Sequence, residues 1–270
     1  GFHGQPVLHQ PERRRTVQIG LGDVLARLTG IDVVNDFRSA DVAAGGQGAP
    51  LVPLYHQALA RSAGVQEPIA IINIGGVGNI TYVGTDGSLI AFDTGPGNAL
   101  IDDWAMAHTG EPLDRDGALA LAGEADMDVL ERLMNHAFFD APPPKSLDRF
   151  SFSPEAVAHL SPADGAATLT AFTVEAIARG LAHVPGVPSR FIVCGGGRHN
   201  PVLMAMLSKR LQGGVLPAED LGWKGDDVEA EAFAYLAVRA LRGLPLSLPA
   251  TTGVPEPMPG GKLHRAEKEN

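Results

Sequence analysis

The order of hydrophobic and polar positions along the chain predicts alternating strands and helices. Short, largely apolar runs that are typical of strands occur at 16–19, 31–34, 69–74, 80–83, 89–93 and 191–194. An Asp86-Gly87 pair, which is a strong hairpin signal, separates two of these runs. Residues 69–93 are therefore expected to form three consecutive antiparallel strands.

Apolar positions spaced by about 3.6 residues predict the helices. These are expected at 23–28, 53–63, 99–108, 127–136, 166–183 and 228–242, and from Asn200-Pro201 onward. Asn200 is expected to cap its helix, and Asp226 or Asp227 to cap the last one. Residues 251–270 are rich in Pro and Gly and then charged, so they are expected to fray. The alternation of strands and helices predicts an α/β fold.

Composition and charge exclude several classes of protein. Apolar residues make up 44% of the 270 residues and charged residues 19%, which is a globular composition. The net charge of −10 implies no basic surface, so neither a nucleic acid nor a membrane is an expected partner. The single cysteine, Cys194, excludes a disulfide framework and a cysteine-based zinc site. A reducing cytoplasm is the expected location.

Three glycine-rich segments follow predicted strands, at 75–79, 94–98 and 195–198. Where a strand leads into a helix through such a turn, backbone N–H groups can approach a phosphate and the helix dipole favours the anion. The alternative is that the glycines only allow tight turns. Neither the G-x-x-x-x-G-K-[ST] pattern nor the dinucleotide-binding glycine pattern is present.

Asp93 is the strongest candidate for acid–base chemistry. It ends a predicted strand beside two glycines, where a carboxylate could take a proton from a hydroxyl or a water. The alternative is that Asp93 caps the following helix or accepts bonds from turn N–H groups. Lys145 is expected to be a solvated loop residue, and neither His3 nor His9 has a partner at metal-ligand spacing.

Several segments, taken in order along the chain, resemble the motifs of one enzyme family. They are His3-Gly4-Gln5, Asp36-Phe37-Arg38, and the segments 45–51, 73–80, 92–98, 143–146, 193–201 and 225–230. On these motifs the sequence resembles the anhydro-N-acetylmuramic acid kinase family. The matches run from residue 3 to about residue 250.

The resemblance implies an actin-like (ribonuclease H-like) fold with two α/β lobes that close on a cleft. The expected lobes are 1–65, an incomplete N-terminal lobe, and 66–250, with a tail at 251–270. It also implies that ATP, with Mg²⁺, phosphorylates 1,6-anhydro-N-acetylmuramic acid while water opens the anhydro ring. The product would be N-acetylmuramic acid 6-phosphate, in cell-wall recycling in the cytoplasm, and the protein would be a homodimer. The implied partners are thus an amino sugar and ATP.

The resemblance also implies roles for individual residues. Asp93 matches the catalytic base. The residues implied to bind the sugar are His3, Gln5, Asp36, Arg38 and Glu229. The residues implied to bind the nucleotide or its phosphates are Asn73, Gly75, Gly76, Asn79, Gly95, Gly97, Gly195, Gly196, Gly197 and Asn200. Metal ligands are not assigned.

The sequence departs from the family pattern at its beginning. The family's opening strand and its Gly-Thr-Ser-x-Asp-type phosphate loop do not occur in the sequence. An N-terminal truncation is therefore expected, either through an incomplete sequence or as a true remnant that binds sugar without catalysis. A different sugar kinase of the same superfamily is the remaining alternative.

Overall fold

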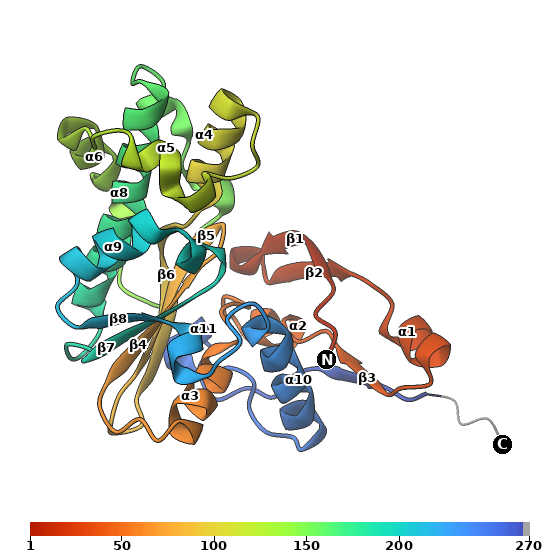
Figure 1. Ribbon diagram of the computed structural model, residues 1–270. Helices are drawn as coiled ribbons and strands as arrows, with labels where there is room; N and C mark the ends of the chain where they lie inside the picture. The colour runs from red at the N-terminus through yellow and green to blue at the C-terminus, as the bar shows by residue number, and fades with distance from the viewer. Residues whose placement is uncertain (267–270) are drawn as a thin grey trace. The chain divides into compact units, whose positions relative to one another are not determined.

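The computed structural model describes residues 1–266 and alternates strands with helices, which confirms the α/β class (Figure 1). The strands are β1 (Gln5–Gln10), β2 (Arg15–Ile19), β3 (Val33–Asn35), β4 (Ile69–Ile74), β5 (Val77–Val83), β6 (Leu89–Pro96), β7 (Arg190–Cys194), β8 (Gly214–Pro217) and β9 (Lys262–His264). The α-helices are α1 (Gly22–Thr29), α2 (Ser39–Ala43), α3 (Pro53–Ser62), α4 (Ala99–Thr109), α5 (Ala118–Leu121), α6 (Met127–Met134), α7 (Ala137–Asp140), α8 (Pro162–Gly180), α9 (Pro201–Arg210), α10 (Val228–Leu241) and α11 (Pro249–Thr252).

The chain forms two compact units. Unit 1 comprises residues 1–64, 89–91 and the chain from Asp227 onward, and unit 2 comprises 65–88 and 92–226. Helix α10 therefore belongs with the N-terminal residues, whereas the sequence analysis grouped it with 66–226. The lobe assignment itself stays a prediction.

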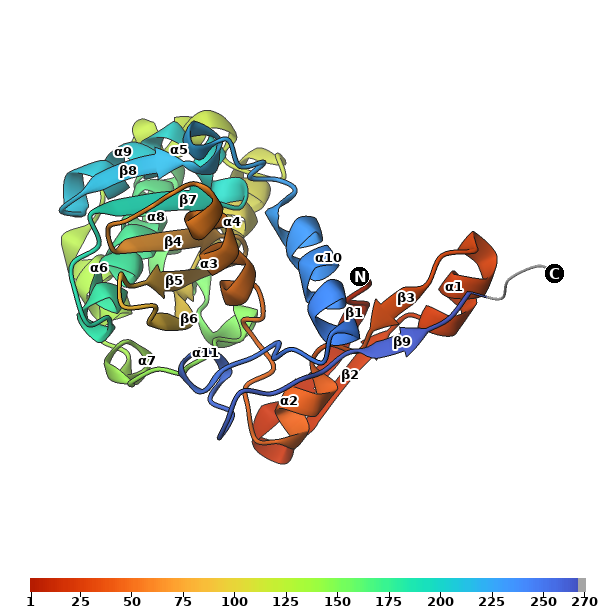
Figure 2. The ribbon, with the colours of Figure 1, turned by 90° about the horizontal axis from the view of Figure 1, so that it is seen from below.

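A five-stranded mixed sheet, most of it in unit 2, has the order β6-β5-β4-β7-β8 (Figure 2). Strand β4 pairs antiparallel with β5 and parallel with β7, and β7 pairs parallel with β8. The three consecutive strands expected at 69–93 are present as neighbours. Strand β4 is central, and Ile69, Ile71, Ile72 and Ile74 are at most 1% exposed. A strand buried on both sides reads as a continuous apolar run, which is why the sequence revealed it.

Helices α8 and α9 cover one face of this sheet (Figure 2). The long helix α8 also packs against α4, α5 and α6. Its first turn contains Gly165, where a Cβ would lie 2.4 Å from the Trp104 ring. This packing fixes the end of β6 and the start of α4, where several candidate residues lie.

Unit 1 is built from two small antiparallel sheets, β1 with β2 and β3 with β9, and from α1, α2, α3, α10 and α11. Its core joins residues from both ends of the chain: Val34, Phe37, Leu51, Phe233, Leu236, Ala237 and Leu246. The Phe37 and Phe233 ring centroids lie 5.2 Å apart. Burial of these apolar side chains brings the two distant segments together.

The expected fraying of residues 251–270 is wrong for the described residues 251–266. Strand β9 pairs with β3 through Leu263 opposite Val34, and Leu263 packs against the unit 1 core. Pairing with a distant strand satisfies the backbone of a segment whose local composition indicates a loop. Residues 267–270 of the predicted tail lie outside the described residues.

Candidate active site

The first glycine segment is a turn between two antiparallel strands. Strand β5 starts at Val77, so only Gly75 and Gly76 connect it to β4. The chain continues into a second strand here, as the three consecutive strands expected at 69–93 imply, so no helix N-terminus follows this segment. Asn73 and Asn79 lie opposite each other across the strand pair, which puts their side chains on one face.

The second glycine segment packs directly on this turn. The backbone N–H of Gly97 donates to the Gly76 carbonyl at 3.0 Å, and that of Asn98 donates to the Gly75 carbonyl at 2.7 Å. The Asn98 side chain donates to the Ile74 carbonyl at 3.2 Å. Gly97 must lack a side chain, since a Cβ would lie 2.2 Å from the Gly75 carbonyl oxygen. Gly95 instead makes room for helix α8, where its Cβ would lie 2.7 Å from Ala176.

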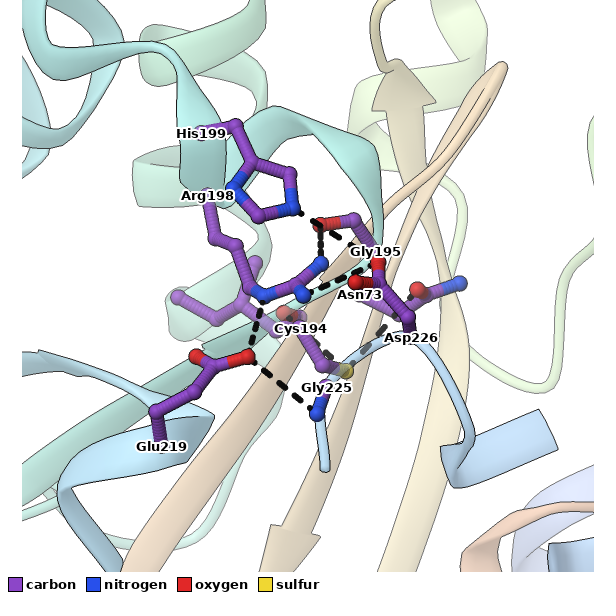
Figure 3. Close-up of polar contacts among 9 residues, drawn as sticks. Asn73, Cys194, Gly195, Arg198, His199, Glu219, Gly225 and Asp226 are labelled. Carbon is purple, nitrogen blue, oxygen red and sulfur yellow. Dashed lines mark hydrogen bonds and ion pairs between the residues drawn. The ribbon is translucent and has the colours of Figure 1, made fainter. Parts of the chain in front are cut away.

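The third glycine segment follows β7 and lies against the same turn (Figure 3). Gly195 has φ of +76°, and a Cβ there would lie 2.5 Å from Asn73 Oδ1. A Cβ on Gly197 would lie 2.4 Å from the Ile74 side chain, whereas Gly196 has more space. Unit 2 thus brings all three glycine segments to one end of β4.

Asn200 serves as the predicted helix cap. Its Oδ1 accepts hydrogen bonds from the backbone N–H groups of Val202 and Leu203, at 3.0 and 3.1 Å. The cap satisfies two N–H groups at the start of α9. Asp227 occupies the N-cap position of α10, one of the two residues expected there, although its side chain donates or accepts no capping hydrogen bond. Asp226 is instead engaged by Arg198.

Asp93 lies on β6, and its carboxylate is held by a loop. The Leu147 N–H donates to Asp93 Oδ2 at 2.8 Å, and the Asp93 N–H donates to the Lys145 carbonyl at 3.0 Å. Burial raises the pKa of Asp93 from its ordinary 3.8 to about 7, although the bond from Leu147 opposes this shift. Asp93 follows the pattern of an acid–base group tuned toward neutral pH. It does not cap helix α4.

Lys145 anchors the loop that holds Asp93, and the expectation of a solvated lysine is wrong. Its side chain is buried, and Nζ donates to the carbonyls of Phe138 and Phe139 at 2.9 and 3.3 Å. Nζ also lies 4.7 Å from the centre of the Phe138 ring. Backbone carbonyls and an aromatic face replace the water that the ammonium loses on burial.

The raised pKa of Asp93 predicts a pH-dependent effect on stability. The unfolded chain ionises this carboxyl near 3.8 and the folded chain near 7, so ionisation costs folding free energy as pH rises between these values. Asp93→Asn removes that cost, and we expect the variant to be more stable than the wild type above pH 7, by up to about 4 kcal/mol. Denaturant unfolding at pH 5 and pH 8 measures the difference.

The matched control is Asp86→Asn in the β5–β6 turn. The pKa of Asp86 is lowered because Ser88 donates to its carboxylate, so the control has the opposite sign and must not stabilise the protein at pH 8. An Asp93→Asn variant equal to or less stable than the wild type at pH 8 would contradict the buried-carboxylate interpretation.

Arg38 and the glycine segment at 45–50 form one connected structure in unit 1. Arg38 Nη1 donates to the Gly48 carbonyl at 2.7 Å. Buried Asp41 accepts from the Gly48 N–H at 2.6 Å and from the Thr252 hydroxyl at 2.5 Å. Burial lowers the pKa of Arg38, and the charges of Glu229 and Asp41 oppose that change. The Arg38 Nε is buried without a hydrogen-bond partner.

The other predicted sugar-binding residues also lie in unit 1. His3 and Asp36 line a surface pocket of about 340 Å³, together with Asn35 and His264. Asp36 has φ of +53°, a strained conformation that is uncommon outside glycine and often marks functional sites.

The other three predicted sugar-binding residues, Gln5, Arg38 and Glu229, do not line this pocket. Glu229 is exposed on the first turn of α10, and Gln5 is exposed at the start of β1.

Sequence reasoning missed Asp41, Thr252 and the buried state of Lys145. No local signal marks Asp41 or Thr252, because their contact joins residues that are far apart in the chain. The side chain of Arg198 was missed as well, although it follows the third glycine segment directly.

Comparison with known proteins identifies the family. The family model described as anhydro-N-acetylmuramic acid kinase matches residues 1–265. The chain belongs to the anhydro-N-acetylmuramic acid kinase family. A member from Paramagnetospirillum magneticum is 58% identical over 98% of this chain and 75% of its own. One from Rhizorhabdus wittichii is 57% identical over 98% of this chain and 72% of its own.

A solved structure of xylulose kinase from Lactobacillus acidophilus also matches, at 12% identity and a TM-score of 0.42, over 77% of this chain and 45% of its own. Membership of the kinase family makes the chain a phosphotransferase that uses ATP. The mixed five-stranded sheet fits the actin-like fold that the resemblance implied. No helix in residues 1–266 combines the length and apolar character that a membrane span requires.

Proposed function

We propose that this chain phosphorylates 1,6-anhydro-N-acetylmuramic acid with ATP while water opens the anhydro ring, giving N-acetylmuramic acid 6-phosphate. One observation carries the proposal. In a chain of the anhydro-N-acetylmuramic acid kinase family, burial brings the carboxyl of Asp93 to a pKa of about 7, and the glycine segment that follows it packs against the other two. A base is most effective when its pKa lies near the working pH.

The reaction needs one proton acceptor and one phosphoryl acceptor. Ionised Asp93 takes a proton from a water molecule, whose oxygen attacks the anomeric carbon C1. The bond between C1 and the bridging oxygen breaks, and that oxygen, still attached to C6, attacks the γ-phosphorus of ATP. The bond from the γ-phosphorus to the ADP oxygen then breaks. The Leu147 N–H fixes the orientation of the Asp93 carboxylate for the first step.

The glycine segments of unit 2 supply backbone donors for the nucleotide. Catalysis of phosphoryl transfer rests mainly on positioning and on stabilisation of phosphate charge. Gly76 at the hairpin turn and Gly196 after β7 are both exposed, so phosphate or ribose oxygens can approach these backbone positions closely. We assign the turn at 75–76 to the phosphates and the segment 195–200 to the adenosine side, as the family resemblance implies.

Arg38 and Glu229 of unit 1 carry the proposed contacts with the sugar. The lactyl group of the substrate is a carboxylate, and a guanidinium binds a carboxylate better than an ammonium does. The unpartnered Nε of Arg38 is a donor that such a ligand would satisfy. His3, Gln5 and Asp36 remain proposed sugar-binding residues on the resemblance alone.

Mg²⁺ is proposed to arrive with the nucleotide. Within residues 1–266 no three His, Cys, Asp or Glu side chains gather as a metal site. In kinases, Mg²⁺ is held by substrate phosphates with one or two carboxylates. When bound, the ion would neutralise charge on the transferring phosphoryl group. The homodimer, the cytoplasmic location and the place in cell-wall recycling are further proposals that rest on the resemblance.

The test is ADP release by the purified chain with ATP, Mg²⁺ and 1,6-anhydro-N-acetylmuramic acid. We expect release that depends on the sugar, and a product whose mass exceeds that of the sugar by one phosphoryl group and one water. The same assay with chelator in place of Mg²⁺ tests the metal requirement.

Two outcomes would favour the alternatives. Sugar binding by calorimetry without ADP release indicates a non-catalytic remnant. ADP release with an unmodified hexose, but none with the anhydro sugar, indicates a different sugar kinase.

A further inference from the structure

The guanidinium of Arg198 is buried in unit 2 and contacts one backbone carbonyl and two carboxylates. The side chain is only 2% exposed, yet it carries a full positive charge. Nη1 donates to the Gly195 carbonyl at 2.8 Å, Nε to Glu219 at 2.9 Å, and Nη2 lies 2.9 Å from Asp226 Oδ1 (Figure 3). A buried cation with three partners of this kind is costly to disrupt.

On one side, Arg198 holds the third glycine segment. The Gly195 carbonyl accepts two bonds from the same residue, one from the Arg198 backbone N–H at 3.3 Å and one from Nη1. These bonds fix a glycine with φ of +76° that fits against Asn73 without room for a Cβ. The guanidinium therefore sets the orientation of the Gly195–Gly196 peptide relative to the turn at the end of β4.

On the other side, Arg198 holds the segment 219–226. Glu219 Oε1 accepts from both Arg198 Nε and the Gly225 N–H, the latter at 3.3 Å. Gly225 lies so close that a Cβ would be 2.4 Å from Arg198 Nε. His199 Nε2 lies 3.5 Å from Asp226 Oδ1, the oxygen that Arg198 Nη2 also contacts. Although burial lowers the pKa of Arg198, its bonds with Asp226 and Glu219 outweigh that effect and raise the pKa.

Both carboxylates remain accessible to water. The Glu219 side chain is 47% exposed and that of Asp226 is 74% exposed. The contacts of the Arg198 guanidinium therefore connect the glycine turn at Gly195 to carboxylates at the surface. If the side chain at position 198 only filled the core, an apolar residue without polar partners would do this equally well.

We propose that Arg198 is a positioning residue for the nucleotide: its guanidinium joins the Gly195 carbonyl to the segment 219–226 and so holds the third glycine segment in the conformation that binds ATP. This inference rests on the proposed function, which assigns 195–200 to the adenosine side. Arg198 acts through the backbone of the loop and need not touch the ligand.

The experiment compares Arg198→Lys, Glu219→Gln and Asp226→Asn with the wild type in the full chain. Lysine keeps the charge but cannot reach three partners in one plane. We expect Arg198→Lys to raise the KM for ATP and the Kd for ADP by about tenfold, with the KM for the anhydro sugar within about twofold. The two carboxylate variants should shift the same constants in the same direction by smaller factors.

Arg210→Lys is the matched control. Arg210 on α9 pairs with Glu175 at 2.7 Å, but its side chain is 50% exposed, so its replacement should leave both KM values unchanged. Equal changes in the two KM values, or a lower melting temperature with unchanged nucleotide constants, would overturn the proposal. Should Arg198→Lys fail to fold, the two exposed carboxylate variants still decide between these outcomes.

Calorimetry with ADP separates this inference from the proposed function. ADP binding that weakens in the variants supports the positioning role even where the wild type turns over no anhydro sugar. A wild-type chain that does not bind ADP contradicts the positioning role directly.

Discussion

Replacement of Asp93 by Asn is expected to lower kcat by about 100- to 10,000-fold, the range that general acid–base catalysis contributes. Asparagine keeps the size of the side chain and an oxygen that can accept from the Leu147 N–H, but it cannot take a proton from water. The KM for ATP should change little, since the glycine segments remain in place. Steady-state ADP release by the two proteins measures both constants.

The pH profile of the wild type gives a second readout of the same residue. Asp93 acts only when ionised, so kcat/KM should rise with pH and level off above a midpoint near its pKa of about 7. Asp86→Asn, in a turn of the same sheet, should show the wild-type profile. A profile that is flat between pH 5 and pH 8, or an Asp93→Asn variant with near-normal kcat, would assign the base to another group.

Gly97→Ala is expected to damage both stability and nucleotide binding. The added Cβ would lie 2.2 Å from the Gly75 carbonyl oxygen and 3.0 Å from the carbonyl carbon of Val77, and these backbone atoms cannot rotate away. Overpacking of this kind costs about 1–3 kcal/mol. The strain falls where the first two glycine segments meet, so we also expect a rise in the KM for ATP of about tenfold or more.

Gly214→Ala on strand β8 is the control for this variant. A Cβ there meets no atom within 4 Å, and the residue lies in the same unit. Its melting temperature and KM for ATP should match the wild type. A Gly97→Ala variant that also matches the wild type would show that the contact between the two segments is not needed.

Local patterns were sufficient to predict most of the elements. The buried strands β4 and β7, the hairpin turn at Asp86-Gly87 and the Asn200 cap each depend on residues that are neighbours in the chain. The family and the fold were predicted from the resemblance of whole motifs. Asp93 was selected because it ends the predicted strand beside glycines. In the structure β6 continues to Pro96, so Asp93 lies within the strand, and its role as the base stays a prediction.

Tertiary structure alone decided the features that depend on distant partners. The buried Lys145 Nζ lies 5.8 Å from the centre of the Phe92 ring, more than fifty positions earlier in the chain, and the pairing of β9 with β3 joins residues more than two hundred positions apart. Likewise, Asp226 follows the pattern of a helix cap, yet a buried arginine 28 positions earlier in the sequence engages it.

The physical reason is that a sequence pattern reports the average burial and hydrogen bonding of a residue among its neighbours in the chain. Which charge is desolvated, and which partner compensates it, depends on contacts that form only when distant segments pack. The sequence by itself therefore determined the α/β elements, the family and the strongest candidate base. Only the tertiary structure decided which glycine segments meet, how Asp93 acquires its raised pKa, and what holds the loop beside Arg198.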